Sequence, residues 1–193
     1  MKVNRIRQNV FPVLAALIWG TAFVAQSVAA DSVEPFTFTA ARSAVAFLFL
    51  LVLCLVFRAL RRRDFQENAQ PRPGSRRDLA VGGICCGVAL TAAVNLQQMG
   101  LETTSSGKAG FITALYIVLV PIAGLFLHRK APRAIWLSVA LAVVGLYLLC
   151  VQESFSITQG DFYVLLCAFC FTGHILIIDH FTQKVDGVAL SCA

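Results

Sequence analysis

The sequence predicts an all-α protein, a polytopic transmembrane bundle of about six helices. Of its 193 residues, 58% are hydrophobic and only 13% are charged, whereas soluble domains carry about 25% charged residues. Apolar runs of about 20 residues, the length that a membrane-spanning helix needs, recur along the chain. The basic residues are gathered between these runs. We therefore expect the lipid bilayer to be the main partner of the chain.

The expected helices follow one another along the chain, and the longest connection, residues 58–78, separates the second from the third. They occupy residues 10–30, 36–57, 79–101, 109–127, 134–151 and 162–178. Pro35 suits the first turn of the second helix, and Asp161 stands where an acidic residue favours the start of the sixth. A cleaved signal peptide does not explain the first run, because the run is too long, has no small-x-small cleavage site and precedes five further apolar segments.

The charges of the loops predict the orientation. Basic residues cluster before the first helix, in the loop after the second (58–77) and in the loop after the fourth (129–133). The alternate loops are acidic, and Lys108 is their single basic residue. Positively charged loops stay in the cytoplasm. We therefore expect residues 1–9 to form a cytoplasmic N-terminus.

Several function classes are excluded by what the sequence lacks. The net charge of +6 does not indicate a nucleic-acid partner, because aromatic residues are not interleaved with the basic ones on a soluble fold. No zinc-protease motif, serine–base pair or phosphate-binding loop is present, so we expect no enzyme and no cofactor. Cys167 and Cys170 have the spacing of a metal or redox motif, but they lie inside an apolar run with no second pair. We interpret them as small packing residues and expect no metal.

An internal repeat relates the first and sixth helices. Phe11-Pro-Val-Leu and Trp19-Gly-Thr align without gaps with Phe162-Tyr-Val-Leu and Cys170-Phe-Thr. Five helices separate the two copies, so the second copy must cross the membrane in the opposite sense. Inverted repeats are typical of secondary transporters. Residues 10–151 therefore form one five-helix repeat, and residues 152–193 begin an inverted second one.

Polar side chains inside a bilayer are costly, so they are candidates for function. The candidates lining a solute cavity are Trp19, Gln26, Arg42, Asn95, Gln98, Thr113 and His174. Four of them, on four different helices, fall about 6–10 Å below the outer surface by helical rise. Within that layer, Arg42 suits an anionic group.

Each candidate also has a purely structural interpretation. Arg42 could instead reach outward to Glu34 or to lipid headgroups, and Trp19 could be a buried aromatic residue. Asn95 and Gln98 could only bridge helices by hydrogen bonds. His174 is either a proton-sensitive group or a helix–helix contact. Pro121 either kinks the fourth helix or frees the carbonyl of Ile117 for a ligand.

Several motifs resemble a known family. They are Leu17-Ile-Trp-Gly-Thr-Ala-Phe-Val24, Arg42, Gly107-Lys-Ala-Gly-Phe-Ile-Thr-Ala-Leu-Tyr116, Val120-Pro121 and Val144-Gly-Leu-Tyr-Leu148. In this order they resemble the EamA domain of the drug/metabolite transporter superfamily. The resemblance implies ten helices in two inverted repeats, in the bacterial inner (plasma) membrane. Tyr116, in the fourth-helix motif, joins the candidate site residues.

We therefore expect a membrane transporter, either a secondary transporter or an exporter, of a small metabolite or drug-like solute. The sequence assigns neither the solute nor a coupling ion. If the second repeat is truncated, the chain is expected to be inactive alone and to need a second copy of itself or a missing C-terminal half. The alternative is a membrane structural or assembly subunit that transports nothing.

Overall fold

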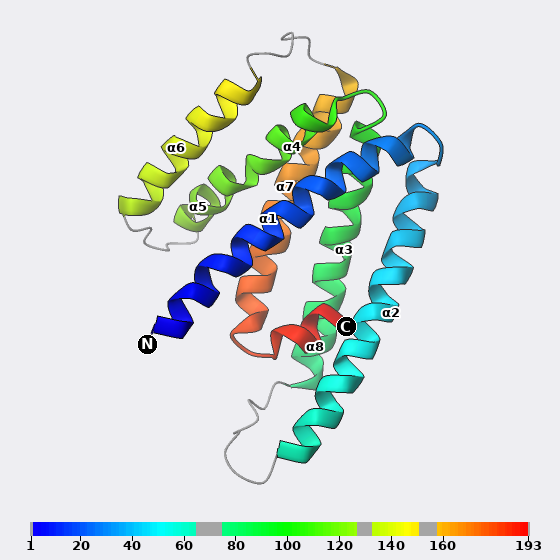
Figure 1. Ribbon diagram of the computed structural model, residues 1–193, viewed down its shortest axis with the longest axis vertical. Coiled ribbons are helices and arrows are strands. Elements are labelled where there is room, and N and C mark those ends of the chain that lie inside the picture. The colour runs from blue at the N-terminus through cyan, green and yellow to red at the C-terminus, as the bar shows by residue number, and fades with distance from the viewer. Residues whose placement is uncertain (1, 65–74, 127–132, 151–157, 193) are drawn as a thin grey trace.

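The computed structural model describes residues 2–64, 75–126, 133–150 and 158–192. Within these residues the chain is helical, with no strand, which confirms the all-α prediction (Figure 1). The helices are α1 (Lys2–Ala30), α2 (Pro35–Asp64), α3 (Arg76–Gly100), α4 (Ser106–Ala114), α5 (Tyr116–Phe126), α6 (Arg133–Cys150), α7 (Gln159–Thr182) and α8 (Gly187–Cys192).

Five segments are long and apolar enough to cross a membrane, by length and composition. These are Val10–Ala30, Pro35–Val56, Arg76–Gly100, Ser106–Phe126 and Gln159–Thr182. The shorter α6, with 18 residues, takes the place of the expected fifth helix. The polytopic helical bundle that the sequence predicts is therefore present.

Several helices extend beyond the predicted apolar runs. At the lower end of Figure 1, α1 begins at Lys2 and α2 continues to Asp64, because neither helix meets a proline or glycine there. At the upper end, α7 begins at Gln159, three residues before the predicted start, because Thr158 caps it. The loops at 65–74, 127–132 and 151–157, which carry Arg72, Arg129, Lys130 and Glu153 of the charges used to predict orientation, lie outside the described residues.

The predicted fourth helix is broken into α4 and α5. The break lies at Leu115, whose N–H donates to Ile112 O at 3.2 Å and whose carbonyl accepts from Val118 N at 2.9 Å. These three-residue spacings tighten the chain for one turn. Pro121 lies further along, inside α5, and has no N–H to donate to Ile117 O. The irregular stretch therefore begins six residues before Pro121.

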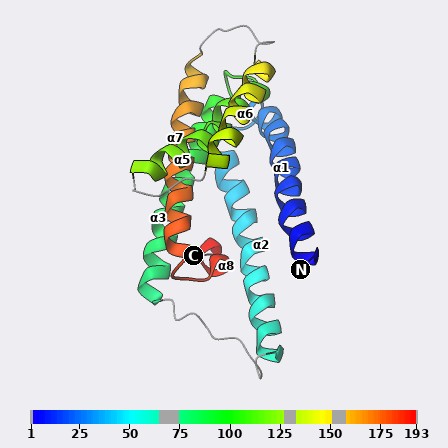
Figure 2. The same ribbon diagram turned by 90° about the vertical axis from the view of Figure 1, so that its left-hand side faces the viewer.

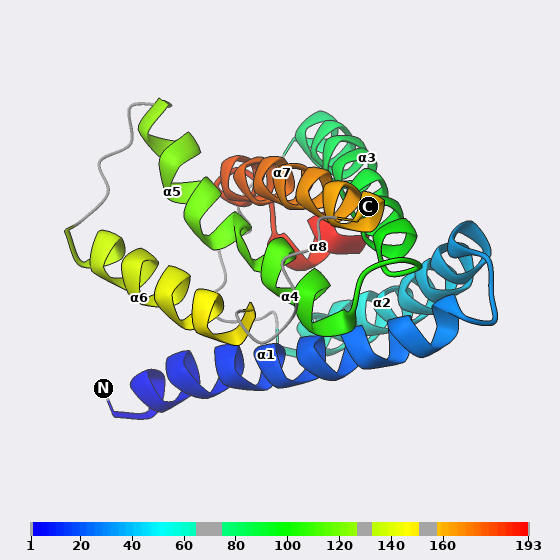
Figure 3. The same cartoon turned by 90° about the horizontal axis from the view of Figure 1, so that it is seen from above.

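The α3–α7 pair forms the centre of the bundle. The two helices run side by side in opposite directions (Figures 1 and 2), and the most extensive helix–helix contacts of the described chain join them. Small, fully buried residues, among them Ala93, Cys167 and Ala168, allow this approach. Viewed from above, α4 lies between α7 and α1, and α1 runs along the edge of the molecule (Figure 3). The centre of the bundle is thus held by close packing of small side chains.

Candidate functional site

A polar contact joins α1 and α2 inside their spanning segments. Arg42 Nη1 donates to Gln26 Oε1 at 2.7 Å, and the Arg42 guanidinium also lies 5.6 Å from the centroid of the Phe38 ring. The Gln26 side chain is held in turn by its own helix, since its Nε2 donates to Ala22 O at 3.2 Å. Arg42 is therefore turned toward α1 and not toward Glu34.

Gln98 connects α3 to the same place. Its side chain is fully buried, and Nε2 donates to the main-chain carbonyl of Gln26 at 3.2 Å. Its other atom, Oε1, has no hydrogen-bond partner among the described residues, and neither has the buried hydroxyl of Thr39. Hydrogen bonds from α2 and α3 thus meet at Gln26 on α1, and Thr39 lies one turn before Arg42 on α2. We call Gln26, Thr39, Arg42 and Gln98 the polar layer.

The polar contacts that α3 and α4 make differ from those that the sequence predicts. Thr113 is buried as a polar residue on α4, but its hydroxyl accepts from Gln97 Nε2 at 3.2 Å and not from Asn95. Asn95 donates to Thr91 O on its own helix at 2.8 Å, and its Oδ1 has no described partner. Sequence reasoning missed Gln97, because it followed a single face of α3. Two consecutive glutamines in an apolar helix are the sequence signal for this contact. Adjacent residues of a helix point in different directions, so the two side chains must contact different neighbours.

Below the polar layer, three aromatic side chains meet from three helices. Trp19 on α1 stacks on Tyr116 on α5, with ring centroids 6.2 Å apart and an interplanar angle of 23°. Phe171 on α7 lies edge-on to Trp19 at 5.9 Å. Trp19 remains 40% exposed, so it is not the fully buried aromatic of the structural interpretation. We call these residues the aromatic cluster. Phe171 was not among the predicted site residues.

His174 lies apart from the polar layer. Its Nδ1 is 3.1 Å from Cys86 O, so it bridges α7 and α3. It stands 15 residues into α7, about 22 Å along the helix, whereas Arg42 is about 10 Å into α2. This geometry corresponds to the helix–helix contact, which is one of the two roles that the sequence allows for His174. The structure does not bring His174 together with the other candidates.

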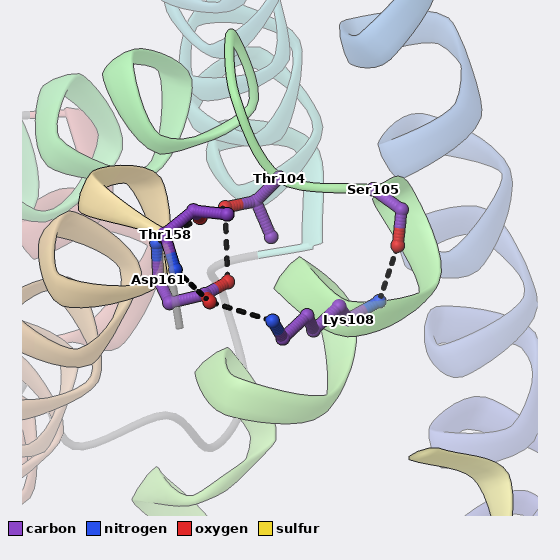
Figure 4. Close-up of polar contacts among 5 residues, drawn as sticks. All are labelled: Thr104, Ser105, Lys108, Thr158 and Asp161. Atoms are coloured by element: carbon purple, nitrogen blue, oxygen red, sulfur yellow. Dashed lines mark hydrogen bonds and ion pairs between the residues drawn. The ribbon is translucent and has the colours of Figure 1, made fainter. Parts of the chain in front are cut away.

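A cluster of polar residues, which we call the clamp, joins the start of α7 to α4 and the loop before it (Figure 4). The Asp161 carboxylate pairs with Lys108 Nζ at 2.6 Å and accepts from Thr158 N at 2.7 Å and from Thr104 Oγ1 at 3.0 Å. Thr158 Oγ1 accepts from Asp161 N at 3.2 Å, which completes a capping box at the start of α7. Ser105 caps α4 by accepting from Lys108 N at 3.3 Å. The clamp, formed by Thr104, Lys108, Thr158 and Asp161, ties α4 and the loop before it to α7.

Two glycines, Gly100 at the C-terminal end of α3 and Gly160 in the first turn of α7, allow these two helix ends to approach each other. A Cβ atom on Gly160 would overlap Gly100 O and the hydroxyls of Thr103 and Thr104, and one on Gly100 would overlap the Val164 side chain. Only hydrogen fits at either position. The close approach of the two backbones therefore positions the hydroxyl and carboxylate groups of the clamp.

The described residues offer no metal site. No group of three or more His, Cys, Asp or Glu residues gathers in this part of the chain. Cys167 is buried and Cys170 half-buried in the α3–α7 region, and both are free thiols. Their surroundings are apolar, including Ala93 and Phe171. This geometry agrees with their interpretation as small packing residues.

The fold and these groups define a class of protein, a polytopic helical membrane protein with polar side chains gathered inside its spanning segments. The family model described as the EamA-like transporter family matches residues 8–151, and the chain belongs to this family. The predicted family is thus confirmed.

A relative extends the comparison beyond the matched domain. The chain is 32% identical over 190 residues to a protein of Archaeoglobus fulgidus named "Uncharacterized transporter". The aligned region covers 98% of this chain and 54% of the relative, so the chain spans about half the length of the curated relative it matches. No solved structure matches the chain.

Proposed function

We propose that this chain supplies one half of a secondary transporter for a small organic solute, and that the polar layer and the aromatic cluster line the solute cavity. Arg42 carries the proposal. It is a half-buried cation about 10 Å inside a spanning helix, and its hydrogen-bond partner, Gln26 Oε1, is a neutral amide oxygen. Charged residues at such depth are costly and mark solute or ion pathways.

The direction of the helices supports the transporter class. The segments that align in the internal repeat lie in α1 and α7, and these two helices run in opposite directions through the molecule (Figure 1). Opposite direction is what an inverted repeat requires. In such transporters the solute site forms between the repeats and is exposed alternately to the two sides of the membrane. Trp19 on α1 and Phe171 on α7 already bring the two repeats into contact.

Transport of an unidentified solute can be tested with a mixture of candidate solutes. The product of the complete reading frame is reconstituted in liposomes loaded with a defined set of small carboxylates, amines, sugars and nucleosides, and the solutes that leave are identified by mass spectrometry. We expect protein-dependent efflux of a small subset and its loss in Arg42→Gln. Arg76→Gln, at an exposed arginine at the start of α3, is the matched control. A correctly folded protein that releases none of the solutes faster than empty liposomes would instead favour the assembly-subunit alternative.

A further inference from the structure

The charge of Arg42 is not balanced by any carboxylate in the described part of the chain. Asp161, the buried carboxylate of the clamp, already accepts from Lys108, Thr158 and Thr104. The contacts that Arg42 does make, to an amide oxygen and to the face of the Phe38 ring, orient the guanidinium but leave its full positive charge. A charge inside a membrane-spanning segment without a counterion is unfavourable. A bound anion would supply the missing charge.

The Gln26 amide cannot be that counterion, and its orientation is fixed. Because Gln26 Nε2 donates to Ala22 O, its oxygen must face Arg42. This contact uses one of the five N–H donors of the guanidinium. The remaining donors of Arg42, which is only half-buried, can bind a carboxylate in the paired geometry that arginine favours.

Two further groups in the polar layer require a partner. The Thr39 hydroxyl is buried without a hydrogen-bond partner in the described part of the chain, and it lies three residues before Arg42, on the same face of α2. It can donate to an anion held by Arg42. The fully buried Gln98 donates one amide N–H to Gln26 O, and its acceptor Oε1 has no hydrogen-bond partner among the described residues. A buried acceptor without a hydrogen bond is unfavourable, so Gln98 favours a ligand with a donor beside its anionic group.

The aromatic cluster defines the rest of the ligand. Trp19 lies seven residues before Gln26, two turns away on the same face of α1 and about 10 Å along the helix. Trp19 as a residue is 40% exposed, and its ring packs against Tyr116 and Phe171. Such a surface binds a flat apolar body by stacking.

We infer that the solute is a small organic anion of net charge −1, with a hydroxyl beside its carboxylate and a planar apolar body. This inference rests on the proposed function. A 2-hydroxy carboxylate with an aryl side chain supplies a complementary group for each: a carboxylate for Arg42 and Thr39, a hydroxyl that donates to Gln98 Oε1, and a ring directed toward the aromatic cluster. A zwitterion brings its own positive charge and leaves the site with a net charge of +1, and a cation is repelled.

Four probes with one phenyl skeleton test the charge and the hydroxyl separately. They are 3-phenyllactate, 3-phenylpropionate, phenylalanine and 2-phenylethylamine, titrated by calorimetry into the purified product of the complete reading frame in lipid nanodiscs. We expect 3-phenyllactate to bind most tightly and loss of its hydroxyl to weaken binding roughly 3- to 10-fold. We expect phenylalanine and phenylethylamine to bind at least about 10-fold more weakly. Arg42→Gln should weaken 3-phenyllactate binding roughly 10- to 100-fold, and Gln98→Leu should remove the advantage of the hydroxyl.

Several results would overturn the inference. They are absence of binding by all four probes, binding of the zwitterion or the amine as tight as that of the anions, and anion binding that survives Arg42→Gln. Arg76→Gln controls for a general effect of removing an arginine. The outcome is independent of the transport assay with mixed solutes. Arg42-dependent efflux without anion binding would contradict the inference but leave the proposed function standing. Anion binding without efflux would contradict the proposed function but leave an anion site at Arg42 standing.

Discussion

The Arg42 guanidinium and the Gln26 amide oxygen, 2.7 Å apart, join α1 to α2 within the spanning segments. The pair combines a cation with a neutral acceptor, although a glutamate at position 26 would have neutralised the charge. A neutral partner keeps Arg42 oriented while leaving its charge available to a ligand. On the proposed function, this choice of residue separates solute binding by Arg42 from the contribution of Arg42 to stability.

Replacing Gln26 tests that separation. Gln26→Glu supplies an internal counterion, so we expect the protein to fold with a thermal midpoint close to the wild type but to lose solute efflux and anion binding. Gln26→Leu removes the acceptor and should destabilise the protein by about 1–3 kcal/mol. Thermal unfolding in detergent and the efflux assay distinguish the two effects. Gln183→Glu, at an exposed position at the end of α7, is the control for added charge. Wild-type efflux by Gln26→Glu would show that the charge of Arg42 is not used.

The clamp should contribute stability and not solute selectivity. Asp161→Asn removes the ion pair with Lys108 and weakens the acceptor for Thr104 and Thr158, so we expect a loss of about 1–3 kcal/mol. Thr158→Ala removes the cap of α7 and should cost about 1 kcal/mol. The thermal midpoint reports both changes, and Asp31→Asn in an exposed loop is the control. An Asp161→Asn protein as stable as the wild type would contradict the clamp.

The Gly100–Gly160 approach predicts a large steric effect from one methyl group. Gly160→Ala drives its Cβ into a carbonyl oxygen and two hydroxyls, so we expect destabilisation by about 1–3 kcal/mol or failure to fold. Gly87→Ala in α3 meets nothing within 4 Å and should have little effect. Comparable expression and thermal midpoints for the two variants would show that the helix ends are further apart.

The membrane orientation predicted from loop charges can be checked by labelling. On a background that lacks the seven native cysteines, Ser32→Cys should react with an impermeant maleimide from outside intact cells. Ser75→Cys should react only after permeabilisation, because the charge rule places this end of the helices in the cytoplasm. Both serines are exposed. The reverse pattern would place the N-terminus outside.

The sequence predicted the helices well, because hydrophobic length is a direct consequence of bilayer thickness. It also predicted that Gln26 and Arg42 lie at one depth, since helical rise converts residue number into distance. Depth does not predict rotation, however. Gln97 contacts Thr113 and Asn95 does not. Which of the two side chains faces Thr113 depends on how α3 is rotated about its axis. Rotation about a helix axis is fixed by tertiary packing.

The clamp could not be predicted for a related reason. Lys108 was noted only as an isolated basic residue in an acidic loop, and Asp161 only as a helix-start residue 53 positions later. Their pairing depends on the approach of α3 to α7 at Gly100 and Gly160. Single glycines in apolar helices do not reveal their partners. The signal that was available is the opposite charge of two residues expected at the same end of the bundle.

The role of Arg42 in solute transport is tested most directly by efflux from liposomes that contain the product of the complete reading frame with Arg42→Lys or Arg42→Gln. Lysine keeps the charge but not the planar fork, so we expect Arg42→Lys to retain part of the flux and Arg42→Gln to reduce it roughly 10- to 100-fold. Insertion and thermal midpoint are measured for both variants. If both insert, fold and transport like the wild type, Arg42 does not hold the solute and the account is contradicted.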